Sequence, residues 1–269
     1  MTTDYQALAV VYDRLMATNR RLLLRRLDAV LARYAPDARS LYDIGAGTGV
    51  VAAHYTARGL QVTAVEPAAA MRALARQRLD RLGASAEVVA GTFEDFALPH
   101  PGRVDVVLAT GEVVNHLSDT SALERSLART ARALAPGGLA WLDASTGAWF
   151  ETLWSRGPRE RTAAGARTRW SPTYDRSRRR GVMEVTVWPT GSAAPAVDRI
   201  AMRPFDYDEV TAAVRRAGLE LIEATPLTGV RLGRRTGRIG YGIRRPPGEL
   251  ARRPQRRQPD AADRAPFVS

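Results

Sequence analysis

The sequence predicts an α/β protein with a doubly wound, mostly parallel sheet. The first observation behind this prediction is a strand–loop–helix–strand unit. An apolar run, Ser40 to Ile44, leads through a glycine-rich loop into a helix-compatible segment, Val50 to Arg58. A β-branched run, Gln61 to Val65, follows and ends at an acid, Glu66. The second observation is that apolar runs and helical segments keep alternating as far as residue 143, which is typical of parallel sheets joined by helices.

The loop of this unit places Gly45, Gly47 and Gly49 one residue apart. Glycine lets backbone N–H groups approach a ligand where a Cβ would collide, and the loop opens onto the positive end of a helix. Glu66 is placed to accept hydrogen bonds from two ribose hydroxyls. A dinucleotide-binding loop has the pattern G-x-G-x-x-G, and here Val50 stands where that pattern needs its third glycine. The unit therefore predicts a nucleotide-like ligand but does not match the dinucleotide pattern.

The spacing D-x-G-x-G-x-G, which begins at Asp43, resembles motif I of the class I S-adenosylmethionine-dependent methyltransferases. In that family the loop covers the methionine part of the cofactor, and the acid after the second strand holds the ribose. The resemblance implies a Rossmann-like methyltransferase fold with seven strands, the last of them antiparallel, and S-adenosylmethionine as cofactor. It covers about residues 4–143 and 204–245, which we take as the cofactor-binding domain.

Residues 1–35 are predicted to form an N-terminal helical cap. Apolar residues at helical spacing indicate two helices between Asp4 and Arg33, with a break near Ala17–Asn19. The opening YQALAVVYDRLM resembles the start of small methyltransferases, in which the second tyrosine faces the reacting centre; here this is Tyr12. The alternative is that Tyr5 and Tyr12 share one packed helix face, and for Tyr5 this is the preferred interpretation.

The segment after the second strand is expected to bind the adenine. A helix from about Ala68 to Leu82 follows Pro67, and Met71 on its first turn is either an adenine contact or part of the core. A third strand, Ala86 to Ala90, leads into GTFEDF, which resembles the family's G-D-A-x-D-F segment. Thr92 replaces the acid of that motif. Adenine recognition is therefore expected from backbone groups, the Thr92 hydroxyl or Glu94.

A fourth strand, Val104 to Leu108, ends in the loop A-T-G-E-V-V-N-H-L. This loop should face the transferable methyl group, because the carboxyl ends of parallel strands line the ligand crevice. It lacks the N/D-P-P-Y sequence of amide- and adenine-methylating enzymes. It resembles instead the loop of small-molecule methyltransferases, including sugar amine N-methyltransferases, which implies His116 as a catalytic base. The alternative is a structural His116 that caps the next helix at Ser118–Asp119.

The resemblance and the residues together give two sets of candidates. The catalytic candidates are His116 and Tyr12. The cofactor-binding candidates are Tyr12, Asp43, Gly45, Ala46, Gly47, Gly49, Glu66, Pro67, Met71, Thr92, Phe93, Glu94, Ala109 and Thr110.

The remaining elements complete the predicted sheet. A helix, Ser121 to Leu134, stops at a Pro-Gly-Gly turn before a strand, Leu139 to Asp143. A last helix, capped by Asp206, precedes a strand from Leu219 to Thr225 and an antiparallel strand from Gly237 to Arg244.

Residues 144–203 interrupt this pattern. They contain four of the five tryptophans and the alternating run Gly181 to Trp188, which indicates a half-buried antiparallel strand. We expect an inserted antiparallel β lid over the substrate, whose aromatic residues form either an apolar pocket or the lid's own core. In relatives such a lid sometimes pairs subunits, so a homodimer is one alternative.

Composition excludes several classes of protein. The chain has 269 residues, of which 45% are hydrophobic and 25% charged, which are globular values. It has no apolar run of about eighteen residues and no basic leader, so we expect a cytoplasmic protein without a membrane span or a signal peptide. It has no cysteine, and its three histidines are not spaced as a metal pair, so no metal is expected.

The net charge of +12 is unevenly distributed. Residues 151–269 carry 24 Arg against 13 acids, and much of the excess lies in a Pro- and Gln-containing tail, residues 246–269, which we expect to be disordered. Nucleic acid is therefore not expected as a partner, and a small-molecule methyl acceptor is. The leading hypothesis is a small-molecule N- or O-methyltransferase. The alternatives are an RNA methyltransferase and a non-catalytic cofactor-binding interaction protein.

Overall fold

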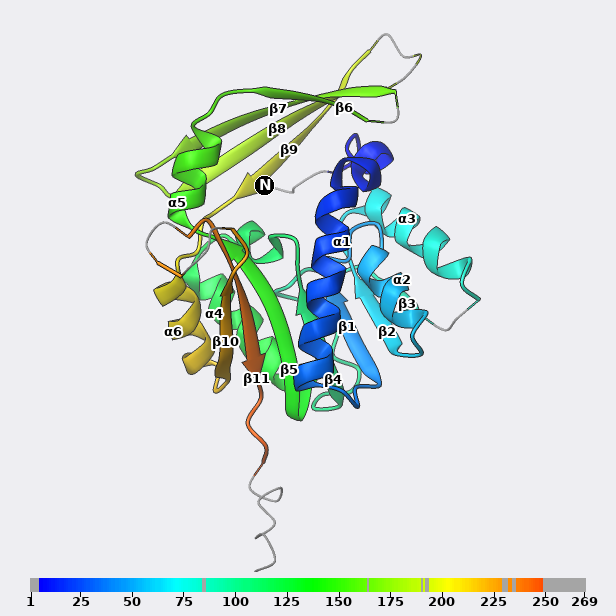
Figure 1. Ribbon diagram of the computed structural model, residues 1–269, viewed down its shortest axis with the longest axis vertical. Helices are drawn as coiled ribbons and strands as arrows, with labels where there is room; N and C mark the ends of the chain where they lie inside the picture. The colour runs from blue at the N-terminus through cyan, green and yellow to red at the C-terminus, as the bar shows by residue number, and fades with distance from the viewer. Residues whose placement is uncertain are drawn as a thin grey trace, which may run out of the picture.

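The computed structural model describes residues 5–83, 86–163, 165–189, 191, 194–228, 232–233 and 236–248 (Figure 1). The elements in chain order are α1 (Ala9–Tyr34), β1 (Ser40–Ile44), α2 (Val50–Thr56), β2 (Gln61–Val65), α3 (Ala69–Asp80), β3 (Glu87–Val89), β4 (Val104–Ala109), η1 (Val113–His116), α4 (Thr120–Ala133), β5 (Leu134–Ser145), α5 (Gly147–Trp149), η2 (Phe150–Trp154), β6 (Arg159–Ala163), β7 (Ala166–Asp175), β8 (Arg180–Trp188), β9 (Ala196–Met202), α6 (Tyr207–Arg216), β10 (Glu220–Pro226) and β11 (Arg238–Arg244).

The main sheet has seven strands in the order β10-β11-β5-β4-β1-β2-β3. Strand β1 pairs in parallel with β2 and with β4, and β4 pairs in parallel with β5. Strand β11 is antiparallel to both of its neighbours, β10 and β5. The chain order reverses between β1 and β4, which is the switch point where doubly wound sheets bind ligands. The predicted fold class, including the antiparallel last strand, is confirmed.

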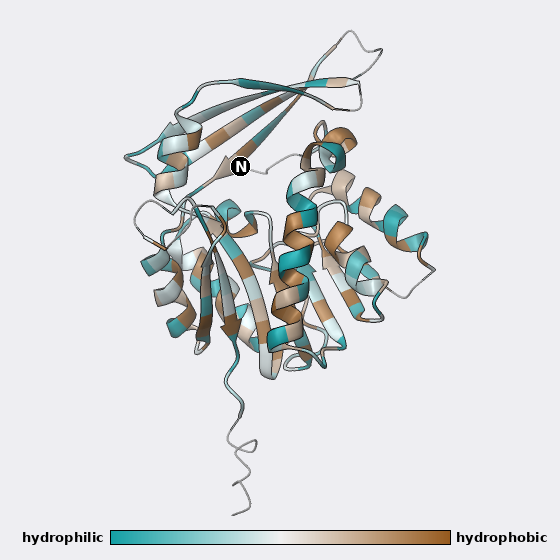
Figure 2. Cartoon of the chain, in the orientation of Figure 1, coloured by the Kyte–Doolittle hydropathy of each residue, from teal (hydrophilic) through white to brown (hydrophobic). Residues whose placement is uncertain are grey.

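Helices cover both faces of this sheet. On one face, the second half of α1 packs with α2 and α3 onto the central strands, and Leu27 and Leu31 of α1 are buried there. On the other face, α4 and α6 pack against the same strands, and Val210 and Val214 of α6 are buried. Figure 2 shows the corresponding pattern. Brown, hydrophobic bands run along the central strands, and on α1 brown bands alternate with teal, polar bands.

The N-terminal cap differs from the prediction of two helices. Helix α1 is continuous from Ala9 to Tyr34 and has no break at Ala17–Asn19. Alanine is the strongest helix former, threonine and asparagine are weaker ones, and none of these residues is proline or glycine, so nothing interrupts the backbone hydrogen bonds. A further tie is the ion pair between Arg20 and Asp13, at 2.5 Å, which joins residues on either side of the predicted break. Propensity alone was too weak a signal to place a helix end here.

The insert between β5 and α6 contains a four-stranded antiparallel sheet in the order β6-β7-β8-β9. In Figure 1 this sheet lies beyond the carboxyl ends of the parallel strands. Its inner face encloses an apolar cluster that includes Phe150, Trp154 and Val185 as well as Leu8 from the N-terminal segment. The Asp198 side chain of β9 ties the same segment down, because its Oδ2 accepts from the Leu8 N–H at 2.7 Å. Phe150 and Trp154 therefore belong to a core that the insert shares with the N-terminal segment.

Three further predictions concern a membrane span, the C-terminal tail and the cap of α6. Among the helices that the structure describes, none is both long and apolar enough to cross a membrane. Of the predicted disordered tail, residues 249–269 lie outside the described residues. The predicted cap of α6 is present, since Asp206 and Glu209 form a capping box.

Candidate functional site

The glycine loop connects β1 to α2 at the carboxyl edge of the sheet. Gly47 has a left-handed backbone with φ +57°, which residues with a Cβ rarely adopt. Gly45 is required for packing as well, because a Cβ there would lie 2.3 Å from the Val113 side chain. Ala46 is buried, and its N–H donates to the Val65 carbonyl at 3.0 Å. The loop is thus held tightly against β2 and the segment that follows β4.

Glu66 lies at the end of β2 and faces this loop. Its Oε2 accepts from the Gly47 N–H and its Oε1 from the Ala68 N–H, both at 2.8 Å. Only 5% of the residue is exposed, and this burial raises the pKa of the Glu66 carboxyl. A carboxylate has about four lone-pair sites, so two remain for further donors. Next to it, the Pro67 carbonyl accepts from Arg72.

Asp43 is buried beneath the same loop. One of its oxygens, Oδ2, has no hydrogen-bond partner within the described part of the chain. Burial raises the pKa of the Asp43 carboxyl to about 7, although a hydrogen bond from the Ala52 backbone opposes the shift. A buried polar atom without a partner is uncommon in a folded protein. It marks this position as one where a donor from a ligand would be favourable.

The first half of α1 is clamped onto the glycine loop. The Asp13 carboxylate accepts from Arg20, Arg78 and the Thr48 hydroxyl, each at 2.5 Å. Although burial alone would raise the pKa of Asp13, the hydrogen bonds from Thr48 and Arg78 lower it overall. Arg20 also lies over the ring of Tyr12, 4.9 Å from its centre. This network places Tyr12 beside the loop, where its ring approaches the position of a Cβ on Gly47 at 3.9 Å.

The candidate adenine contacts lie on α3 and on the segment after β3. Met71 is buried, with 2% of its surface exposed, and Phe93 is buried as well. The Thr92 hydroxyl donates to Asp95 at 2.7 Å, and Glu94 pairs with Arg125 at 2.7 Å. The two polar side chains are thus engaged with neighbours, which leaves backbone groups for the adenine edge.

His116 is held by a tyrosine from the N-terminal segment. The Tyr5 hydroxyl lies 3.1 Å from His116 Nε2. Burial lowers the pKa of His116 to about 4, and a hydrogen bond to the Ala201 backbone opposes this shift. A hydrogen bond that raises the pKa of a histidine is one that the ring donates, so we assign the ring N–H to the Ala201 side and the acceptor role toward the Tyr5 O–H to Nε2. His116 is therefore neutral, with both nitrogens engaged.

One of the alternatives for these residues is wrong, and the other holds in part. Tyr5 precedes α1, yet its carbonyl accepts from the Ala9 N–H in the turn before the helix, and Tyr5 and Tyr12 pack against the same apolar cluster. The next helix is capped by Asp119, which accepts from the Ala122 N–H at 2.8 Å, so His116 is not its cap. The rings of Tyr5 and Tyr12 lie 6.2 Å apart in an edge-on arrangement, and the structure brings both predicted tyrosine positions to the same edge.

A group that the sequence analysis did not select lies at the end of β4, next to the buried Ala109 and Thr110. The Asp143 carboxylate accepts from the Glu112 N–H at 2.8 Å and from Arg238 at 2.7 Å. Glu112 has a left-handed backbone with φ +68°, and its side chain accepts a hydrogen bond from the Ser145 hydroxyl. The positions of these acids in the sequence could have indicated them. Asp143 lies near the end of β5, Glu112 follows β4, and these two strands are parallel neighbours.

Comparison with known proteins relates this part of the chain to methyltransferases. A family model described as a methyltransferase domain matches residues 41–138, the span that contains the glycine loop, Glu66 and His116. Residues 41–138 thus match a methyltransferase domain, and the chain has the fold of an S-adenosylmethionine-dependent methyltransferase. S-adenosylmethionine is the cofactor of this family, as the sequence predicted.

Individual relatives are distant from this methyltransferase domain. A ubiquinone biosynthesis O-methyltransferase from Bradyrhizobium is 34% identical over 120 residues, which are 42% of this chain and 45% of that protein. The chain spans about half the length of the curated relatives it matches. Among solved structures, a methyltransferase from Clostridium acetobutylicum is 12% identical with a TM-score of 0.78, over 90% of this chain and 99% of its own. An amino pentose methyltransferase from Micromonospora echinaspora is 23% identical with a TM-score of 0.61, over 82% and 89%. These two structures show the fold.

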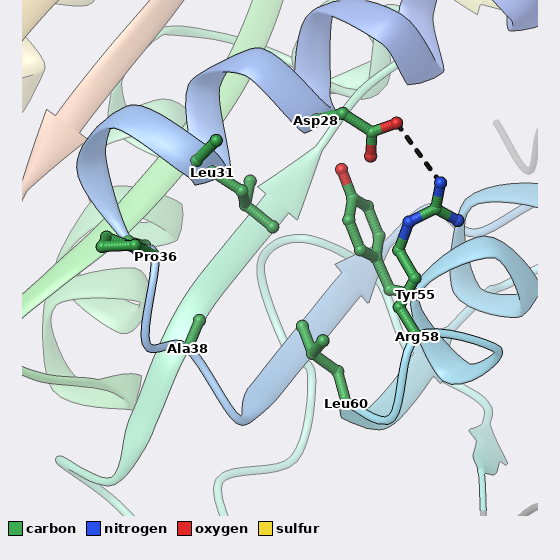
Figure 3. Close-up of a pocket in the computed structure, with 9 residues that line it drawn as sticks. Asp28, Leu31, Pro36, Ala38, Tyr55, Arg58 and Leu60 are labelled. Carbon is green, nitrogen blue, oxygen red and sulfur yellow. Dashed lines mark ion pairs between the residues drawn. The ribbon is translucent and has the colours of Figure 1, made fainter.

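A separate hollow lies at the opposite edge of the methyltransferase domain. It has a volume of about 390 Å³ and is lined by residues from α1, α2 and the loops before β1 and β2. Figure 3 shows Tyr55 beside the hollow and the Asp28–Arg58 ion pair at its rim. Ligands of doubly wound sheets bind at the carboxyl ends of the strands. This hollow is therefore separate from the site formed by the glycine loop, Glu66 and His116. Among the described residues, no cluster of three or more His, Asp or Glu side chains could hold a metal ion.

Proposed function

We propose that this protein transfers a methyl group from S-adenosylmethionine to a nitrogen or oxygen of a small molecule. The observation that carries the proposal is the pairing of the glycine loop with Glu66 at the switch point of a seven-stranded methyltransferase sheet. The four-stranded lid beyond this edge favours an acceptor small enough to be enclosed.

The residues at the loop fit the cofactor. Glu66 retains lone pairs for the ribose hydroxyls, and the loop around Gly47 exposes backbone next to it. The buried Asp43 oxygen without a partner suits an N–H donor of the loop or the ligand. Arg20, held beside the loop by Asp13, is a cation that suits the carboxylate of the methionine part. When bound, S-adenosylmethionine supplies an electrophilic methyl group on a positively charged sulfur.

The chain's own contribution is to hold the acceptor in line with that methyl group and to exclude water, which is worth several kcal/mol in comparable reactions. Tyr5 and Tyr12 from the N-terminal segment and His116 from η1 surround the acceptor side of this site. Because the pKa of His116 is lowered to about 4 by burial, its imidazole is a weak base at neutral pH. Its role in this proposal is to hold the Tyr5 hydroxyl in a fixed direction rather than to remove a proton.

The relatives differ in the acceptors that their names give. One is named an O-methyltransferase of ubiquinone biosynthesis and another a sugar N-methyltransferase, so both N- and O-methylation are compatible with this domain. A cytoplasmic location and a homodimer formed through the lid are part of the proposal, and light scattering of the purified protein tests the second. A cysteine-free sequence gains no disulfides from an oxidising compartment.

Calorimetric titration tests the cofactor assignment. S-adenosylmethionine and S-adenosylhomocysteine are titrated into the full chain, with a nicotinamide dinucleotide as the control ligand. We expect binding of the first two in the micromolar range, about −8 kcal/mol, and no binding of the control. Binding of the dinucleotide, or of none of the three, would contradict the proposed function.

A further inference from the structure

The contact between Tyr5 and His116 joins two segments that are far apart in the sequence, and a third segment holds both of them. The Tyr5 hydroxyl lies 3.1 Å from His116 Nε2. Tyr5 itself precedes α1, so its position depends on what holds the start of that helix. This support comes from β9, a strand of the four-stranded lid.

The Asp198 side chain of β9 binds the start of α1. Its Oδ1 accepts from the Ala7 N–H at 3.0 Å and its Oδ2 from the Leu8 N–H at 2.7 Å. The N-cap position of α1 is occupied by Leu8, whose apolar side chain cannot cap a helix. Asp198 supplies the missing acceptors from 190 positions away, and a carboxylate also suits the positive end of the helix dipole.

This interaction lies in an apolar environment. Asp198 is 1% exposed, and Leu8 is fully buried. Leu8 and Val11 pack with Val185 and Ile200 of the lid in one apolar cluster. Hydrogen bonds to a charged group are strong in such surroundings, because water cannot replace either partner. The start of α1 is thus attached firmly to the lid.

The other end of β9 holds the segment that carries His116. Arg203 directly follows the last residue of β9 and donates its N–H to the Asn115 carbonyl at 2.7 Å. The Asn115 amide donates in turn to the Arg203 carbonyl at 2.8 Å. Asn115 is fully buried and is the neighbour of His116 in η1. One strand therefore holds the Tyr5 segment near its start and the His116 segment at its end.

We propose that Asp198 is a positioning residue for methyl transfer, which places the Tyr5 hydroxyl against His116 by holding the start of α1 on the lid. This inference rests on the proposed function, in which Tyr5 faces the acceptor. Without the Asp198 carboxylate, the N–H groups of Ala7 and Leu8 lose a buried acceptor, and the first turn no longer fixes Tyr5. The lid and the tyrosine that faces the acceptor are thereby set in position together.

NMR spectroscopy of the full chain with isotope-labelled histidine tests this inference without knowledge of the acceptor. The chain has three histidines, and the spectrum of His116→Asn identifies the His116 signals. Tyr5→Phe removes the hydroxyl beside Nε2 and so defines the signal of His116 without its partner. Asp198→Asn keeps the volume of the side chain but removes its charge and one of its two acceptor oxygens.

We expect Asp198→Asn to shift the His116 Nε2 signal in the same direction as Tyr5→Phe does. The double variant should show no larger shift than Tyr5→Phe alone, because Asp198 acts on His116 through Tyr5. Solvent exchange of the Ala7 and Leu8 amide protons should become about tenfold faster in Asp198→Asn, as the loss of hydrogen bonds to a charged group predicts.

The matched control is Glu184→Gln in the neighbouring strand β8. The Glu184 carboxylate pairs with the exposed Arg199 at 3.1 Å, so this variant also replaces a carboxylate of the lid by an amide. It should leave the His116 signal at its wild-type position. Thermal melting verifies the fold of each variant.

Two outcomes overturn the inference. One is a wild-type His116 signal in folded Asp198→Asn. The other is a larger shift in the double variant than in Tyr5→Phe, because Asp198 would then act by another route. If Asp198→Asn does not fold, Ala7→Pro removes one of the two donors and leaves Asp198 in place, and the same outcomes decide. Proline is tolerated in the first turn of a helix.

The proposed function is tested separately in the same preparation. If the wild type binds neither S-adenosylmethionine nor S-adenosylhomocysteine, the proposed function fails, whereas the His116 signals still show whether Asp198 holds Tyr5 in place. If the wild type binds both and the His116 signal of Asp198→Asn is unchanged, only the role of Asp198 fails.

Discussion

The two halves of the site are built in different ways. The central part of the cofactor half, from Asp43 to Glu66, is one continuous βαβ unit in which the contact of Glu66 with Gly47 joins residues 19 positions apart. The acceptor half is assembled across the whole chain, since Tyr5 and His116 are 111 positions apart and Asp143 and Arg238 are 95 apart. A site within one local unit can be predicted from its sequence pattern. A site whose residues are brought together by the tertiary fold becomes apparent only in the structure.

The halves also differ in what they offer a ligand. In the cofactor half, the Glu66 carboxylate is anchored by the backbone N–H groups of Gly47 and Ala68, so the loop and the acid form one rigid unit. In the acceptor half, side chains hold one another, as in the pairs Tyr5–His116 and Ser145–Glu112. Substitutions should therefore separate the halves, with binding of the cofactor affected by one set and turnover by the other.

The largest effect is expected for Glu66→Ala. Loss of its hydrogen bonds to two ribose hydroxyls should weaken S-adenosylhomocysteine binding about 100-fold or more, because hydrogen bonds to a charged group contribute about 1.5–3 kcal/mol each. Titration calorimetry measures the loss, and Glu87→Ala, an exposed acid on the neighbouring strand β3, is the control. Equal affinities of the two variants would remove Glu66 from the ribose site.

The next largest expected effect is on the stability of the fold, and it comes from the buried His116. Its pKa is lowered to about 4 by burial, against about 6.5 in an unfolded chain. Between these values only the unfolded state takes up the proton, so stability is lost as the pH falls from 6.5 to 4, by at most about 3 kcal/mol.

Urea unfolding at pH 7.5 and pH 5 measures this term. The difference in free energy of unfolding between wild type and His116→Asn should be smaller at pH 5 than at pH 7.5. His100→Asn, at an exposed loop position, serves as the control for general pH effects. A difference that does not change with pH would mean that His116 is not held neutral in the folded protein.

The two tyrosines provide a smaller effect that separates them. Tyr5→Phe removes the hydroxyl that bonds His116 and should lower kcat about tenfold, as the loss of one hydrogen bond of about 1.5 kcal/mol predicts. Its affinity for S-adenosylhomocysteine should not change. Tyr12→Phe is the matched variant, and we expect a smaller loss of kcat from it. A larger loss of kcat in Tyr12→Phe than in Tyr5→Phe would indicate that Tyr12 is the catalytic residue, as the sequence resemblance implies.

Much of the fold and half of the site were predictable from sequence, for a physical reason. Strand bounds such as Ser40–Ile44 and Gln61–Val65 were predicted to the residue, because β-branched runs and glycine are strong local signals. The predicted break at Ala17–Asn19 was wrong because Thr18 and Asn19 lower helix propensity only slightly, and tertiary contacts outweigh so small an effect. Glu112 and Tyr5 were not selected, since a left-handed glutamate and a hydrogen bond across the chain leave no local pattern.

The smallest expected effect is that of Ser145→Ala. This variant removes the hydroxyl that holds the Glu112 side chain, and the loss of a neutral donor of about 0.5–1 kcal/mol should lower kcat about threefold. Thr173→Ala, on the exposed side of β7, is the control for loss of a hydroxyl. Steady-state kinetics with the acceptor found by a screen of amines and alcohols measures both. If Ser145→Ala lowers the affinity for the cofactor instead of kcat, Glu112 contributes to cofactor binding, and the division of the site into two halves is wrong.

A crystal structure of the full chain with S-adenosylhomocysteine tests the central claim most directly. We predict both ribose hydroxyls within hydrogen-bond distance of the Glu66 carboxylate, and the thioether sulfur directed toward Tyr5 and Glu112. A ribose held by a different acid, or a ligand seated in the hollow between Asp28 and Tyr55 at the opposite edge of the sheet, would contradict the division of the site into these two halves.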